Sequence, residues 1–139
     1  MPLLQILSQF AILIAMENRY GIKAIAIDLD GTLLTSQKTI TDHTLNTLRY
    51  VMDRGIHVII ATGRSLPTSR DYIRQVKPDF PAICYNGSCI YDPVTKQDIW
   101  STHLSHEICT TIVQLSTTSD AHLHAFMDHT LYFSEAGRD

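Results

Sequence analysis

Two carboxylates separated by a single residue, Asp28 and Asp30, follow the apolar run of residues 22–27. Along an extended strand such residues share a face, so both carboxylates are expected on the same side. Two close negative charges are stabilised by a divalent cation with oxygen ligands, most naturally Mg²⁺. A positioned aspartate can attack phosphorus and form an aspartyl-phosphate. A second acid can then protonate the leaving oxygen and later activate water.

The next two residues, Gly31 and Thr32, suit a loop that presents these acids. Glycine permits a tight turn, and the threonine hydroxyl can hold the loop. The five residues 28–32 are, by themselves, equally compatible with a plain surface turn after a strand.

Two further short motifs follow later strand-like runs. Thr62, Gly63 and Arg64 stand between a strand-like and a helix-like segment, where a hydroxyl, a glycine amide and a helix N-terminus suit a phosphate oxygen. Asn86 and Gly87 follow the next run and predict either a sharp turn or an amide offered to a substrate. Each motif alone is ambiguous, because Thr-Gly at a helix start is often only a cap.

The segments around these motifs alternate between strand-like and helix-like patterns. Apolar, β-branched runs predict strands at residues 22–27, 56–61 and 81–85, and apolar residues at helical spacing predict helices at 41–52 and 65–77. Short links between them indicate an α/β fold, a Rossmann-like parallel sheet with flanking helices. Ligands bind beyond the carboxyl ends of such strands, so all three motifs should converge on one crevice.

The pattern changes after Gly87. A turn signal at Asp92-Pro93 predicts a hairpin over residues 88–101, apolar spacing predicts a helix over 105–118, and a second hairpin is expected over 121–134. We interpret these elements as a second, α+β unit inserted after the third strand.

The three motifs in this order resemble the haloacid dehalogenase superfamily of phosphatases, and within it the Cof-type branch, subfamily IIB. The resemblance implies Mg²⁺-dependent hydrolysis of a sugar phosphate or similar small phosphoester through an aspartyl-phosphate. It implies that Asp28 is the nucleophile, that Asp30 is the general acid and base, and that both bind Mg²⁺, Asp30 through its backbone carbonyl. The phosphate- and substrate-binding residues would be Gly31, Thr32, Thr62, Gly63, Arg64, Asn86 and Gly87.

The resemblance also divides the chain. Residues 1–20 would be an apolar N-terminal extension, 21–87 the N-terminal part of the core, and 88–139 part of an α+β cap. A phosphate-neutralising lysine and a further acidic pair belong to the family pattern after the cap and are not found in these 139 residues. We therefore expect a truncated chain with poor activity. The alternative is a catalytically incomplete fragment with no function or only a binding function.

The apolar stretch at residues 2–16 allows three interpretations: a helix packed on the body, an interfacial anchor, or sequence translated from too early a start. It is too short to span a bilayer and lacks the features of a signal peptide. We favour Met16 as the natural start. A membrane-attached protein that uses this stretch is the rival.

Composition narrows the function classes. Apolar residues make up 45% and charged residues 18%, a globular balance. The net charge of −3 argues against nucleic acid as a partner, and three cysteines argue against a disulfide framework. We expect a cytoplasmic protein with a small phosphorylated metabolite as its partner, no stable membrane insertion, and self-association through an exposed sheet edge.

Other chemistries fit the residues less well. Two sets have ligand types that suit Zn²⁺, but an ordinary hairpin face and helix flank explain them more simply: His122, His124 and His129, and His103, His106 and Cys109. Cys84 and Cys89 are expected to be buried strand residues rather than nucleophiles. A phospho-accepting receiver domain would need an acidic pair ahead of its aspartate, which this chain lacks.

Overall fold

The computed structural model describes residues 21–119 and 121–134. The N-terminal extension, and with it the hypothesis of a start at Met16, lies outside these residues. The chain divides into two compact units, one ending at Ser101 and the other beginning at Thr102. Among the described residues, no helix is long and apolar enough to cross a membrane.

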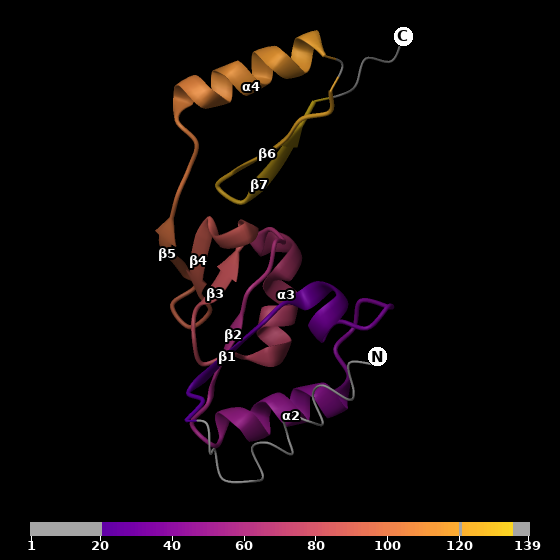
Figure 1. The fold of residues 1–139 in the computed structure, drawn as a ribbon, viewed down its shortest axis with the longest axis vertical. Coiled ribbons are helices and arrows are strands. Elements are labelled where there is room, and N and C mark those ends of the chain that lie inside the picture. The colour runs from indigo at the N-terminus through magenta and orange to yellow at the C-terminus, as the bar shows by residue number, and fades with distance from the viewer. Residues whose placement is uncertain (1–20, 120, 135–139) are drawn as a thin grey trace. The chain divides into compact units, whose positions relative to one another are not determined.

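The first unit contains the predicted parallel strands. β1 (Ala24–Ile27) pairs in parallel with β2 (His57–Ile60), with Ala24 opposite His57. A parallel bridge between Ala61 and Ile83 joins this pair to β3 (Ala82–Cys84). The sequence-based expectation of an α/β fold with a parallel sheet and flanking helices is therefore confirmed (Figure 1).

The two helices of this unit begin and end at residues that suit those positions. α2 (Asp42–Met52) begins after Thr41, whose hydroxyl accepts a hydrogen bond from the Thr44 amide at 3.1 Å. α3 (Leu66–Val76) begins after Ser65 and ends at Lys77, which takes the left-handed conformation common after a helix. α2 packs on β2, α3 packs on β3, and the two helices contact each other.

One apolar core lies between the strands and these helices. Val58 and Ile60 of β2 are fully buried, as are Leu48 of α2 and Ile73 of α3 to within 2% exposure. Leu29, which stands between the two aspartates, is also fully buried and belongs to the same cluster. The site loop is thus anchored in the core by the residue that separates its two acids.

The hairpin after Gly87 extends the sheet of the first unit. β4 (Cys89–Asp92) pairs antiparallel with β3, and β5 (Gln97–Ser101) pairs antiparallel with β4. A tight turn at Tyr85–Gly87 folds β4 back along β3, so this hairpin lies in the unit that ends at Ser101. The assignment of residues 88–139 to a cap stays a prediction.

The two cysteines of this sheet, Cys84 and Cys89, face each other across β3 and β4 and are buried, as the sequence predicts. Burial, reinforced by the nearby Asp98 carboxylate, raises the pKa of the Cys89 thiol to about 12. Such a thiol is a poor nucleophile at neutral pH.

The second unit holds the remaining predicted elements. α4 (His106–Thr118) begins after Ser105, whose hydroxyl accepts a hydrogen bond from the Ile108 amide at 3.3 Å. β6 (His124–Met127) and β7 (Thr130–Phe133) form an antiparallel hairpin. Several of its large apolar side chains are exposed, among them Leu115 and Phe133.

Candidate active site

Asp28 and Asp30 stand in a tight loop directly after β1. The Asp28 carbonyl accepts a hydrogen bond from the Leu33 amide at 3.1 Å, and the Leu29 carbonyl accepts one from Leu34 at 2.9 Å. Gly31 takes φ +70°, a left-handed conformation that favours glycine, as the turn requires. Because Leu29 points into the core, the two aspartates are left on the exposed side of the loop.

Backbone hydrogen bonds close the loop around Thr32. Among the described residues the Thr32 hydroxyl has no hydrogen bond, so its role in holding the loop stays a prediction.

Asp30 forms the strongest electrostatic contact of the site. Its carboxylate accepts two hydrogen bonds from the Arg64 guanidinium, from Nε at 2.6 Å and from Nη2 at 2.8 Å. The Lys38 ammonium donates a third, at 2.5 Å. Arg64 first and Lys38 second hold the pKa of the Asp30 carboxyl well below its usual range. Asp30 is thus an ionised carboxylate in this arrangement.

Asp28 has different surroundings. It is exposed, and no side chain in the described part of the chain bonds or pairs with its carboxylate. One of the two acids is therefore open to a ligand, while the other is held by two cations.

The second and third motifs meet through the backbone. The Asn86 amide donates to the Thr62 carbonyl at 3.3 Å, and the Tyr85 amide donates to the Arg64 carbonyl at 2.9 Å. Thr62 is buried, and its hydroxyl oxygen accepts from the Arg64 amide at 3.2 Å. The hydroxyl hydrogen of Thr62 remains able to donate to an anion.

The Asn86 side chain approaches Gly63 closely. A Cβ added there would lie 2.6 Å from the Oδ1 atom of Asn86, inside van der Waals contact. Tyr85, Asn86 and Gly87 all have positive φ, an uncommon conformation for the first two, which turns Asn86 toward Gly63. A side chain at position 63 would therefore have to displace that of Asn86.

Two residues of this site, Lys38 and Tyr72, were missed by the sequence analysis. The Tyr72 hydroxyl donates to the Lys38 carbonyl at 3.0 Å, and the Arg64 guanidinium carbon lies 5.2 Å from the centre of the Tyr72 ring. Tyr72 therefore steadies both cations that hold Asp30. In the sequence, the only signal for Lys38 was its charge in the loop after the acids, and Tyr72 looked like an ordinary helix residue.

The oxygen donors of the site are of the type that suits Mg²⁺, but they form a partial set. Across residues 21–119 and 121–134, no group of three or more His, Cys, Asp or Glu side chains could hold a metal ion. Asp28 contributes a carboxylate that no described side chain pairs with, whereas the Asp30 carboxylate is engaged by Arg64 and Lys38.

Comparison with known protein families identifies the family of this chain. Residues 25–139 match the family described as haloacid dehalogenase-like hydrolase. The chain belongs to this family. The resemblance inferred from the three motifs is thereby confirmed, and the matched range includes all three of them.

Relatives of this chain include named phosphatases. The 5-amino-6-(5-phospho-D-ribitylamino)uracil phosphatase of Bacillus subtilis is 36% identical over 101 residues, which are 70% of this chain and 37% of the relative. The pyridoxal phosphate phosphatase of Escherichia coli is 40% identical over 70 residues, 50% of this chain and 26% of the relative. The chain thus spans well under half the length of these curated relatives.

Solved structures agree on the fold. A haloacid dehalogenase-like hydrolase from B. subtilis has a TM-score of 0.72 at 27% identity, over 84% of this chain and 40% of that one.

Proposed function

We propose that this chain carries the nucleophile and phosphate-binding half of a site that hydrolyses small phosphoesters. The observation that carries the proposal is the meeting of three motifs, through Arg64 with Asp30 and Asn86 with Thr62, at the carboxyl ends of three strands. The named phosphatases among the relatives support the same class of reaction.

In the proposed reaction, Asp28 supplies the nucleophile. A carboxylate oxygen of Asp28 forms a bond to phosphorus as the bond from phosphorus to the leaving oxygen breaks. The leaving oxygen takes a proton from Asp30 and departs as an alcohol. Asp30, now a carboxylate, takes a proton from water, and the resulting hydroxide displaces the phosphoryl group from Asp28 as inorganic phosphate. Both aspartates are then restored.

The ion pair at Asp30 sets a condition on this sequence. A carboxylate held by Arg64 and Lys38 suits the second, base-catalysed step, but it is a poor proton donor for the first. An arriving phosphate is itself an anion and would compete for both cations. We propose that this competition releases Asp30 so that it can carry a proton, and that Arg64 and Lys38 then bind phosphate oxygens.

The phosphoryl group has further donors in the proposed site. The hydroxyl of Thr62, the amide of Gly63 and the first turn of α3 would bind its oxygens, and Gly31, Thr32, Asn86 and Gly87 would line the space around the substrate. Mg²⁺ would be held by Asp28 and by the Asp30 backbone carbonyl. When bound, it would neutralise charge on the phosphoryl oxygens.

The test measures the binding of beryllium trifluoride, a phosphoryl analogue, by ¹⁹F NMR in the presence of Mg²⁺. This readout does not require turnover. We expect a bound signal with the wild-type chain and its loss in Asp28→Asn. Asp42→Asn, an exposed acid at the start of α2, is the matched control and should keep the signal. An unchanged signal in Asp28→Asn, or none in the wild type, would overturn the proposal.

The alternative is a chain that binds phosphate but does not turn it over. It is favoured by the partial set of metal-binding oxygens and by the ion pair that engages Asp30. Phosphate release from p-nitrophenyl phosphate separates the two functions. If the chain binds beryllium trifluoride but shows no phosphate release that depends on Asp28, the alternative is supported. If phosphate release occurs and is lost in Asp28→Asn, the proposed phosphatase is supported.

A further inference from the structure

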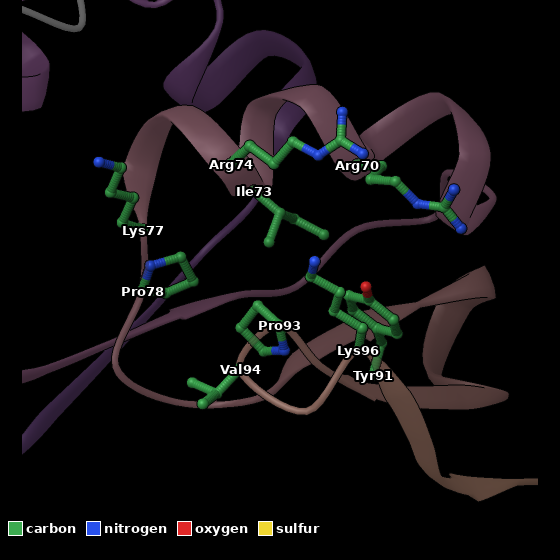
Figure 2. A pocket seen from close by; sticks show the side chains of 9 residues that line it. All are labelled: Arg70, Ile73, Arg74, Lys77, Pro78, Tyr91, Pro93, Val94 and Lys96. Carbon is green, nitrogen blue, oxygen red and sulfur yellow. The ribbon is translucent and has the colours of Figure 1, made fainter.

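We propose that the cavity between the end of α3 and the β4–β5 turn is a second anion-binding site, for a small phosphorylated molecule. The cavity has a volume of about 700 Å³, and all the residues that line it belong to the first unit. That volume lies in the range of small-molecule sites, about 300–1,000 Å³. Figure 2 shows α3 along one side and the turn with Lys96 along the other.

Four cationic side chains line this cavity: Arg70, Arg74, Lys77 and Lys96. Only Arg74 has an ion-pair partner in the described part of the chain, Asp71 at 3.1 Å, and that pair is largely exposed. The positive charge of the cavity is thus mostly uncompensated, although the chain as a whole is acidic.

Arg70 has a donor that the described residues leave without an acceptor. Its Nε atom is buried and has no hydrogen-bond partner among the described residues. A buried donor without a partner destabilises the fold, so such groups are uncommon in proteins. Because this atom is not exposed, an anion in the cavity reaches it only when the Arg70 side chain moves toward the cavity.

The dipole of α3 does not account for the cluster. The end of a helix attracts cations, which would explain Arg74 and Lys77. Arg70 stands in the middle of the helix, however, and Lys96 comes from the turn of a separate hairpin. Two elements thus bring cations to the same cavity.

The walls between the cations are apolar. Ile73 and Tyr91 are buried at 2% and 7% exposure and form part of the core beneath the cavity. Apolar walls lower the local dielectric constant and so strengthen a charge-assisted hydrogen bond. The occupant best suited to them is a compact molecule with at least two negative charges.

This cavity is separate from the candidate active site. Tyr91 is opposite Ala82, the first residue of β3, whereas Asn86 of the active site follows the last. α3 likewise begins beside Arg64 and sends its final turns to the cavity; its 11 residues span about 16 Å. The inference therefore does not depend on the proposed phosphatase function.

The experiment titrates the full chain with inorganic pyrophosphate, without Mg²⁺, and follows amide shifts by ¹⁵N NMR. We expect shifts at Ile73, Lys77 and Lys96 that saturate. The double variant Arg70→Gln, Lys96→Gln should bind roughly tenfold more weakly, since it loses two charge-assisted contacts. Lys23→Gln with Arg49→Gln removes the same charge from exposed positions elsewhere and should bind like the wild type.

Three outcomes would overturn the proposal: no binding in the millimolar range, shifts confined to residues 62–64, or equal weakening in the control pair. Lys96→Gln alone guards against misfolding, because Lys96 lies in an exposed turn. Circular dichroism of each variant checks the fold. A failure of beryllium trifluoride to bind at Asp28 would not change the pyrophosphate titration, so each proposal can fail without the other.

Discussion

The guanidinium of Arg64 donates two hydrogen bonds to the carboxylate of Asp30, which lies 34 positions earlier in the sequence. Arginine makes such paired contacts because its N–H groups form a rigid fork that matches a carboxylate. The pair joins the loop after β1 to the segment after β2, and Lys38 adds a third contact to the same carboxylate. Two cations of this triad, Arg64 and Lys38, thus hold one carboxylate.

Replacing Arg64 by Gln should raise the pKa of the Asp30 carboxyl toward its ordinary range, because the larger of two stabilising contacts is lost. Lys38→Gln should raise it less. A ¹³C NMR titration of the Asp30 carboxyl carbon measures both. Lys23→Gln, an exposed lysine outside the triad, should leave the titration unchanged. If Arg64→Gln left the Asp30 titration where it was, the ion pair would not exist in solution.

Gly63→Ala should displace the side chain of Asn86, since the new Cβ would lie 2.6 Å from its Oδ1 atom. Asn86 is exposed and can move, so we expect the free energy of unfolding to fall by only about 1 kcal/mol. The side-chain amide resonances of Asn86 should shift, and the binding of beryllium trifluoride should weaken.

The matched control is Gly63→Ala made in a chain that also carries Asn86→Ala. Removing the amide gives the Cβ its space, so the alanine at 63 should then cost little. A double-mutant cycle measures this coupling. Equal costs in both backgrounds would show that Gly63 is not needed for the approach of Asn86.

Local patterns in the sequence predicted the elements, and long-range contacts decided the rest. Thr41 ahead of apolar spacing predicts the start of α2, and the cap bond to Thr44 bears this out. The grip of Arg64 and Lys38 on Asp30 could not be predicted, because it depends on how Tyr72 of α3 packs against a loop 34 residues earlier. The sequence of the hairpin after Gly87 also does not reveal that it pairs with β3. Alternating apolar and polar residues predict a strand but do not identify its neighbour in the sheet.

Asp79→Asn should make stability less sensitive to acid. Burial alone would raise the pKa of Asp79, but hydrogen bonds from His57 at 2.6 Å and from the Val58 amide at 3.2 Å outweigh it, and the pKa is lowered. A lowered pKa in the folded state means that Asp79 stabilises the fold above its unfolded pKa, near 3.8. That contribution is lost as the pH falls through the folded value.

The measurement for Asp79 is urea unfolding at neutral pH and at about pH 3. Because Asp79 and His57 are about two-fifths exposed, we expect Asp79→Asn to cost about 1 kcal/mol or less at neutral pH, and less still in acid. Asp71→Asn breaks a far more exposed pair and should change little at either pH. A cost for Asp79→Asn that grows in acid would reverse the sign and refute the argument.

Self-association is expected through the free edge of β1. Among the described strands β1 pairs only with β2, and its Ala24 and Ala26 are exposed. An unpaired edge invites another chain, and lysine at an edge discourages it. Sedimentation velocity should show mass rising with concentration, and Ala26→Lys should shift the chain toward the monomer. Ala121→Lys adds the same charge at an exposed loop position and should not. If Leu115→Lys on α4 dissociated the chain and Ala26→Lys did not, the apolar surface of the second unit would be the contact instead.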